Sequence, residues 1–287
     1  MQIGFIGVGT MGRPMADNLL RHGYKLNVFD RNPLAINAFA GRAHLAKSAA
    51  ECARCDAVIV MVAFDDQVRD VVEEIALAED RNNNLIIAIM STVLPKTMNE
   101  ILLICQDRKI GLIDAPVMGM PARAIAGKLV VVAGGELRHV ESLRPIFSAF
   151  SVAVHHMGEL TKGQLTKLIN NMIAVTNLFL FGEALNLSAR FDLDVGKLVE
   201  IMETGGGRSF FTQDWQQSIA NFSTFTDSKE STATIVDICR KDIGYAKMLA
   251  RSANMAAPLL EASSDAVADL AYEHVLKSWR SIVDRAK

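Results

Sequence analysis

Two groups of residues in this chain have types and spacing that could bind a small molecule and exchange a proton with it. A glycine pattern of the form G-x-G-x-x-G occupies residues 7–12 after a short apolar run, and Asp30 ends the next apolar run. Farther along, Lys167 and Asn171 lie four positions apart in a helical pattern. The first group is typical of a dinucleotide-binding turn. The second can exchange a proton and hold an oxygen atom.

Each residue of the glycine turn has a mechanical role. Gly7 permits a tight turn, Gly9 lets the backbone approach a pyrophosphate, and Gly12 lets the following helix pack against the strand. The N-terminus of that helix directs free N–H groups and a positive dipole end at the phosphates. We therefore expect the dinucleotide to be bound by Gly7, Val8, Gly9, Thr10, Met11 and Gly12.

The two residues at the end of the second apolar run indicate which dinucleotide is bound. Asp30 can accept hydrogen bonds from both adenosine ribose hydroxyls and repels a 2′-phosphate, which favours NAD. Arg31 follows directly and could instead bind that phosphate with its planar guanidinium group. The sequence thus predicts NAD, with NADP as the alternative.

Lys167 is surrounded in sequence by Leu168, Ile169 and Met172. An apolar environment desolvates an ammonium group and lowers its pKa, so this lysine could exchange a proton near neutral pH. Asn171, one helical turn later, could donate to and accept from the same substrate oxygen. The alternative is a lysine that extends to solvent beside a capping or buried asparagine.

The composition excludes several classes of protein. With 287 residues the chain suits two domains, 1–160 and 161–287. A net charge of −2 argues against nucleic-acid or membrane partners, and the apolar stretch 171–189 is interrupted by polar residues. The N-terminus enters a strand at once, which leaves no room for a signal peptide and predicts a cytoplasmic protein.

The pair Cys52 and Cys55 has the spacing of a redox or zinc motif. No second Cys or His pair at metal-binding spacing accompanies it, and the stretch is rich in alanine. We expect two reduced thiols and no metal site.

The first domain alternates short apolar runs with helical patterns, which predicts an α/β fold with a doubly wound parallel sheet. The expected strands are 2–6, 25–30, 57–62, 85–90, 111–115, 129–133 and 152–155. We expect the last two to pair antiparallel at an edge.

The second domain is expected to be all-helical. A long helix over 162–190 joins it to the first, and further helices are expected near 194–203, 209–221, 231–252 and 257–285. Phe210, Phe211 and Trp215 lie at helical spacing after a triple-glycine break; core packing is the common meaning of such a stripe, and a cleft wall is the alternative.

Four blocks of the chain together resemble the β-hydroxyacid dehydrogenase family, which includes 3-hydroxyisobutyrate dehydrogenases and tartronate semialdehyde reductases. The blocks are the glycine turn, Asp114-Ala115-Pro116-Val117, the segment 163–171, and Lys241-Asp242-Ile243-Gly244. The resemblance implies a Rossmann domain followed by a helical domain that binds substrate and forms a homodimer or homotetramer.

The resemblance also implies a role for individual residues. Lys167 matches the catalytic general acid/base, Asn171 the asparagine that positions substrate, Thr92 a contact to the nicotinamide end, and Lys241 a lysine that closes over cofactor and substrate. Val62 is likewise expected to contact the cofactor. For Lys241 and Asp242 the alternative is a solvated helix face.

The predicted substrate loop departs from the family pattern. Relatives usually continue it Ser-Gly-Gly, whereas this chain has Met118, Gly119 and Met120. Losing the serine removes a hydrogen-bond donor, and methionines make the pocket narrower and less polar. Arg123 is a candidate cation for the substrate's acid group, and Trp215 is a candidate wall.

The sequence therefore predicts a dehydrogenase that transfers a hydride between a nicotinamide cofactor and a small 3-hydroxy acid or its semialdehyde. One alternative is an imine reductase-like enzyme that acts on a less polar substrate. The other is a dinucleotide-binding protein without catalytic activity.

Overall fold

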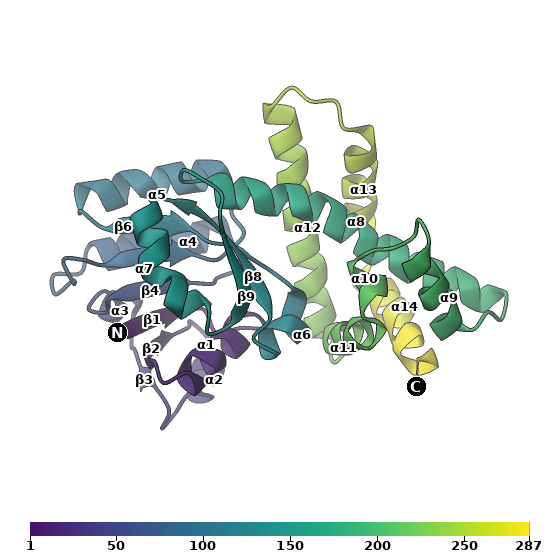
Figure 1. Cartoon of the computed structure of the whole chain (residues 1–287), viewed down its shortest axis with the longest axis horizontal. Coiled ribbons are helices and arrows are strands. Elements are labelled where there is room, and N and C mark those ends of the chain that lie inside the picture. The colour runs from purple at the N-terminus through teal and green to yellow at the C-terminus, as the bar shows by residue number, and fades with distance from the viewer. Residues whose placement is uncertain (287) are drawn as a thin grey trace. The chain divides into compact units, whose positions relative to one another are not determined.

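The structure is a computed structural model that describes residues 1–286. The chain divides into two compact units, Met1–Lys167 and Leu168–Lys287, and the division falls within helix α8 (Lys162–Arg190). The first unit holds the sheet and the second is helical, which confirms the predicted fold class (Figure 1).

The sheet of the first unit has the strand order β3-β2-β1-β4-β5-β6-β8-β7, with β9 paired to β8. The strands β1 to β6 all run parallel, because helices connect most of them across the faces of the sheet. The bounds are β1 Gln2–Ile6, β2 Lys25–Phe29, β3 His44–Leu45, β4 Ala57–Val60, β5 Ile86–Ile89, β6 Gly111–Asp114, β7 Val117–Met118, β8 Leu129–Gly135 and β9 Ser151–His156.

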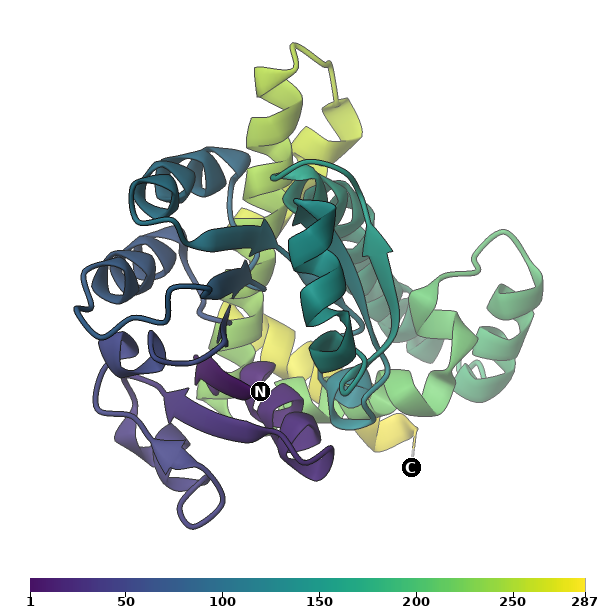
Figure 2. The same cartoon turned by 60° about the vertical axis from the view of Figure 1, so that its left-hand side comes forward.

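Helices cover both faces of this sheet (Figure 2). One apolar layer packs side chains of α1 and α7, such as Met15 and Leu143, against one face of the strands. The other packs side chains of α4 and α5, such as Val72 and Ile101, against alternate residues of the same strands. The helices of this unit are α1 Gly12–Arg21, α2 Pro33–Asn37, α3 Ala49–Cys52, α4 Asp65–Ala76, α5 Pro95–Asp107, α6 Met120–Ile125 and α7 Leu137–Phe147.

The antiparallel pairing expected for the last two strands is wrong. Strands β8 and β9 run parallel, with Val131 opposite Val154, because the whole helix α7 lies between them and carries the chain back to the same end of the sheet. The antiparallel neighbours of β8 are β6 and the two-residue strand β7, which the sequence pattern did not predict.

The second unit contains α9 to α14 after the long helix α8. Two predicted helices are each divided in two: 209–221 becomes α10 and α11, and 257–285 becomes α13 and α14. Asp214 is extended and its carboxylate accepts the backbone N–H of Gln217 at 2.9 Å, so it ends one helix and caps the next. The bounds are α9 Val195–Thr204, α10 Phe210–Gln213, α11 Trp215–Phe225, α12 Lys229–Ser252, α13 Pro258–Asp269 and α14 Tyr272–Arg285.

Aromatic side chains form much of the core of the second unit. Trp279 is buried, and its ring lies 5.4 Å from that of Phe222 and 5.5 Å from that of Phe179, measured between centroids. Trp215 meets Phe181 edge-on at 6.2 Å. Trp215 therefore takes part in core packing, as is common for such an aromatic stripe, although it is also partly exposed.

Helix α8 is long and apolar enough, by length and composition, to cross a membrane. This is weak support for a membrane span, because a core helix of a water-soluble protein meets the same test. The first turns of this helix also contain polar side chains, and two of them, Gln164 and Asn171, are buried.

All four cysteines are free and buried. Burial raises the pKa of the Cys55 thiol to about 12 and raises that of Cys52 as well. Neutral thiols of this kind are unreactive, which agrees with the expectation of two reduced thiols.

Candidate active site

The glycine turn follows β1, at the edge of the sheet where its parallel strands end. A side chain at Gly12 would place its Cβ 1.9 Å from the carbonyl oxygen of Gly7, so the close approach of α1 to the turn requires glycine. At Gly9 a Cβ would meet no heavy atom of the described residues within 4 Å. The turn thus leaves space beside Gly9 for a ligand.

The start of helix α1 suits an anionic ligand. Across the described residues no side chain caps this N-terminus, and its first turn contains no acidic residue. Its backbone N–H groups and positive dipole end are consistent with binding of phosphates. Together with the space at Gly9, these features fit a dinucleotide pyrophosphate.

Asp30 and Arg31 are held by different partners. The Asp30 carboxylate accepts the N–H of Val8 through Oδ2 and that of Asn32 through Oδ1, both at 2.8 Å. Arg31 instead donates from Nη2 to Asp70 of α4 at 2.8 Å, in an exposed ion pair. The acid is fixed at the glycine turn, while the guanidinium is drawn toward α4.

The ends of β4 and β5 are joined by hydrogen bonds of Ser91. Its Oγ accepts the N–H of Val62 at 2.8 Å, and the hydroxyl lies 3.4 Å from the carbonyl oxygen of Val60. Thr92, the next residue, is partly exposed. Val62 and Thr92 therefore lie on adjacent loops at the carboxyl edge of the sheet, where ligands of such folds bind.

Asp114, at the end of β6, caps the N-terminus of α8. Its carboxylate is fully buried and accepts the N–H of Thr161 at 2.8 Å and that of Gln164 at 2.6 Å. Burial raises the pKa of Asp114 to about 6, although the backbone N–H bonds act in the opposite direction. This capping role of Asp114 was not predicted from the sequence, where the residue only marked one of the four blocks of the family resemblance.

Gly163 makes this cap sterically possible. A Cβ at this position would lie 2.5 Å from the carbonyl oxygen of Val132 and 2.8 Å from Oδ2 of Asp114. The first turn of α8 can therefore lie directly on the strand ends only because residue 163 has no side chain.

Lys167 and Asn171 lie one turn apart on α8, as predicted. Lys167 is partly buried and Asn171 is buried. The apolar surroundings expected for Lys167 are present in part: Leu168 is buried, but Ile169 is 58% exposed and turns to another side of the helix.

Three polar side chains are linked in the second unit. Asn171 donates from Nδ2 to Oδ2 of Asp242 at 2.6 Å, and the ammonium group of Lys241 lies 3.3 Å from Oδ1 of Asp242. The side chains of Lys241 and Asp242 are only 8% and 7% exposed. The alternative of a solvated helix face at these two positions is therefore wrong.

The predicted substrate loop lies within the first unit. Met118 is in β7 opposite Val130, and Gly119 and Met120 follow at the start of α6, which carries Arg123. Met120 has a φ of +63°, in the left-handed region that non-glycine residues rarely adopt. A methionine thus occupies a strained position where the family pattern has glycine.

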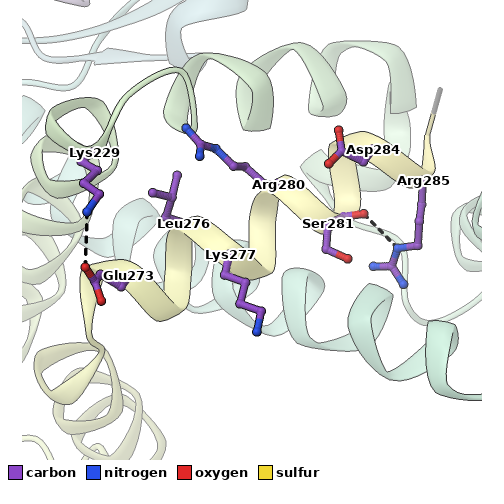
Figure 3. Close-up of a pocket in the computed structure, with 8 residues that line it drawn as sticks. All are labelled: Lys229, Glu273, Leu276, Lys277, Arg280, Ser281, Asp284 and Arg285. Carbon is purple, nitrogen blue, oxygen red and sulfur yellow. Dashed lines mark hydrogen bonds and ion pairs between the residues drawn. The ribbon is translucent and has the colours of Figure 1, made fainter.

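A groove of about 570 Å³ lies along α14 in the second unit, and its lining includes none of the predicted site residues (Figure 3). Its walls are mostly charged, but several of these charges are bound to the protein. Lys229 pairs with Glu273 at 3.4 Å, and Arg285 donates to the carbonyl oxygen of Ser281 at 3.0 Å. We therefore do not regard this groove as an alternative to the predicted active site.

The two units hold different parts of the predicted site. The first contains the glycine turn, Asp30, Arg31, Val62, Thr92, the substrate loop, Arg123 and Lys167, and the second contains Asn171, Trp215 and Lys241. In residues 1–286 no group of three or more His, Cys, Asp or Glu side chains is arranged to hold a metal ion.

A glycine turn after the first strand of a sheet ordered 3-2-1-4-5-6 is the mark of Rossmann dehydrogenases, which use a nicotinamide cofactor. Residues 2–158 match the family model for the NAD-binding domain of 6-phosphogluconate dehydrogenase. Residues 161–278 match the model described as the NAD-binding region of NADP-dependent 3-hydroxyisobutyrate dehydrogenase. The chain belongs to the β-hydroxyacid dehydrogenase family.

Known relatives agree with this membership. The chain is 30% identical over 290 residues to 3-sulfolactaldehyde reductase of Escherichia coli (strain K12), covering 99% of this chain and 95% of that one. It is 31% identical over 264 residues to NAD-dependent L-serine dehydrogenase of Pseudomonas aeruginosa, covering 90% and 88%. A solved 3-hydroxyisobutyrate dehydrogenase of Mycobacterium tuberculosis with L-serine has the same fold, with a TM-score of 0.77, 24% identity, and coverage of 97% and 99%.

These findings confirm the family resemblance and the nicotinamide cofactor. The protein is an NAD(P)-dependent hydroxyacid dehydrogenase or reductase.

Proposed function

We propose that the protein catalyses the reversible oxidation of a small 3-hydroxy acid to its semialdehyde, with Lys167 as general acid/base. The observation that carries the proposal is the pairing of Lys167 and Asn171 on adjacent turns of α8, with the Asn171 amide held by buried Asp242. A proton-exchanging group and an oriented amide on one helix can serve the same substrate oxygen.

Lys167 moves the proton in this mechanism. In the oxidation direction its neutral amine removes the proton from the substrate hydroxyl, and in reduction its ammonium form returns a proton to the carbonyl oxygen. The bound nicotinamide ring supplies the hydride chemistry at the neighbouring carbon. General acid/base assistance of this kind contributes about 10² to 10⁴ in rate.

Asn171 acts as a donor rather than as a mixed donor and acceptor. A carboxylate only accepts, so the Asn171 atom that faces Asp242 is the amide nitrogen. Oδ1 of Asn171 already accepts a hydrogen bond from Nδ2 of Asn170 at 3.2 Å. The second N–H of Asn171 is then the group left to hold the substrate oxygen.

The substrate class follows from the loop and from the relatives. 3-Sulfolactaldehyde and L-serine, named in the two relatives, each combine an aldehyde or hydroxyl carbon with an acid group on a short chain. We assign acid recognition to the loop Met118, Gly119 and Met120 with Arg123, and a wall of the pocket to Trp215. Met118 offers no hydroxyl, so the experiment below also includes the imine reductase-like alternative with a less polar substrate. It includes cofactor binding without catalysis as well.

NAD is the preferred cofactor in this proposal. Asp30 is fixed at the glycine turn, where it can bind ribose hydroxyls, while Arg31 is engaged by Asp70. We assign Val62 and Thr92 to cofactor contacts and Lys241 to closure over cofactor and substrate.

We also propose a cytoplasmic homodimer or homotetramer. Helix α8 exposes Ile169, Ile173, Leu180 and Leu187, each more than half accessible, and these are the residues that an association through this helix would bury. Light scattering on the eluting protein tests this, and a purely monomeric species would reject it.

The function is tested with a panel of substrates read by nicotinamide absorbance, with NAD(H) and NADP(H) in parallel. The panel contains short semialdehydes, 3-hydroxyisobutyrate, L-serine, 3-sulfolactaldehyde and cyclic imines. Lys167→Ala should abolish nearly all turnover and leave NADH binding intact. Lys162→Ala, which removes an exposed lysine from the same helix, is the matched control and should keep its activity. Full activity of Lys167→Ala would overturn the assignment.

A further inference from the structure

Gln164 binds the backbone on both sides of a single residue. The side chain is fully buried in the first turn of α8. Its Nε2 donates to the carbonyl oxygen of Ser91 at 2.7 Å, and its Oε1 accepts the N–H of Val93 at 3.1 Å. The residue between these two contacts is Thr92, so the amide fixes the backbone that carries Thr92.

The segment that Gln164 holds is itself connected to the neighbouring loop. Ser91 Oγ accepts the N–H of Val62 at 2.8 Å. A continuous chain of hydrogen bonds therefore runs from the loop after β4, through Ser91, to the side chain of Gln164. Both proposed cofactor-contact residues, Val62 and Thr92, lie on the backbone that this chain fixes.

The backbone of Gln164 is anchored at the same time. Its N–H is bound by Oδ2 of buried Asp114 at 2.6 Å. Lys167 follows three residues later in the same helix. A helix rotates by about 100° per residue, so any slip or rotation of this turn would break the contacts of Gln164 and displace Lys167 together.

We propose that Gln164 is a positioning residue that sets the distance between the proton-exchanging Lys167 and the loop of Thr92. This inference rests on the proposed function, because it assigns Lys167 and Thr92 to the two parts of the reacting assembly. All residues in the argument belong to the first unit. A side chain needed only to fill space would be apolar at a fully buried position, whereas Gln164 uses both ends of its amide on two backbone groups.

Two substitutions separate the contacts. Gln164→Met keeps the approximate volume and removes both hydrogen bonds. Gln164→Glu is the second variant: it keeps an acceptor for the Val93 N–H, and only its protonated form can donate to the carbonyl oxygen of Ser91. The matched control is Asn27→Leu, which removes a buried amide elsewhere in the first unit, where Asn27 accepts a hydrogen bond from Gln2 at 2.8 Å.

The readouts are the melting temperature, the cofactor Kd, kcat, and the isotope effect on kcat with nicotinamide deuterated at the transferred position. Displacing reacting groups by about 1 Å costs about a hundredfold, so kcat should fall about tenfold to a hundredfold in the Gln164 variants. The isotope effect should rise because the chemical step becomes slower, and the cofactor Kd should change little. Asn27→Leu should lower the melting temperature and leave kcat and the isotope effect unchanged.

Hydrogen–deuterium exchange gives a readout that needs no turnover. The Val93 amide should exchange faster in Gln164→Met than in the wild type or in Asn27→Leu, because its acceptor is lost. A lower melting temperature with unchanged kcat and isotope effect would show a purely structural role and overturn the proposal. If the wild type is inactive but Val93 still exchanges faster in Gln164→Met, the proposed function is refuted, whereas the hydrogen bond between Gln164 and Val93 is supported.

Discussion

Asn171 and Asp242 are 71 positions apart in the chain, yet the amide nitrogen of one lies 2.6 Å from the carboxylate of the other. Both side chains are buried, and Lys241 lies on the other oxygen of the same carboxylate. The carboxylate thus orients the amide and balances the charge of the lysine. Asn171 and Lys241, which we assign to the substrate, are therefore both held by Asp242, which need not contact the substrate itself.

Asp242→Asn should therefore destabilise the protein and reduce its activity. Removing one partner of a buried ion pair costs about 3 kcal/mol or more, because the remaining charge loses its compensation. The amide of Asn171 also loses its fixed acceptor, which should lower kcat more than it changes the KM for the cofactor. Thermal unfolding and steady-state kinetics measure the two effects.

The double variant Lys241→Met with Asp242→Asn provides the control. If the two charges compensate each other, the loss of stability in the double variant is smaller than the sum of the two single losses. Additive losses would contradict the pairing.

Asp30→Ser should shift the cofactor preference from NAD toward NADP. The variant loses the charged acceptor for the ribose hydroxyls, a change of about 1.5–3 kcal/mol that weakens NAD by about tenfold or more. It also removes the negative charge that repels a 2′-phosphate. The ratio of kcat/KM values for the two cofactors measures the shift.

Asp70→Asn is the companion variant for this cofactor test. It releases Arg31 from its exposed ion pair and leaves Asp30 in place. We expect a smaller gain for NADP than in Asp30→Ser. An unchanged ratio in Asp30→Ser would show that this acid does not select the cofactor.

Asp114 should make stability depend on pH in the acidic range. Burial raises its pKa from 3.8 to about 6, so the folded protein binds this proton more tightly than the unfolded chain. The stabilisation from that proton is fully present below about pH 3.8 and is lost as the pH rises through 6. The difference amounts to about 3 kcal/mol.

Denaturant unfolding from pH 4 to pH 7, compared with Asp114→Asn, isolates this contribution from other carboxyl groups. The stability of the wild type relative to the variant should fall from pH 4 to 6 and then level off. A constant difference across this range would mean that Asp114 titrates at its ordinary pKa.

Met118→Ser should improve turnover of small hydroxy acids. It returns a hydroxyl donor to the predicted substrate loop, and one such hydrogen bond is worth about 1–3 kcal/mol against a substrate that pairs with it. We expect about a tenfold gain in kcat/KM for acids and a loss for cyclic imines. A gain for imines instead would favour the less polar substrate class.

Much of the fold was predictable because buried parallel strands give continuous apolar runs, and β1, β4 and β5 are such runs. The direction of β9 was not predictable from its own residues, because it depends on where α7 returns the chain. The break at Asp214 carried a usable signal, since an acid three residues before Gln217 is a common helix cap. The break after α13 lies at Leu270 and Ala271, which carry no such signal.

The placement of the proposed site residues on their helix was easier to predict than the residues that support them. The positions of Lys167 and Asn171 on one helix followed from their spacing. The roles of Asp114 and Gln164 did not, because each acts on backbone groups many residues away. The burial of Lys241 and Asp242 was equally hidden, since two adjacent charged residues are usually at the surface.

The distribution of thiols offers a built-in probe of opening. Cys52, Cys55 and Cys105 lie in the first unit and Cys239 in the second, and all four are buried. A thiol reagent can label them only during transient opening of the structure around them. Mass spectrometry of partly labelled protein would then report, on one sample, which half of the molecule opens first and how strongly a bound cofactor holds it closed.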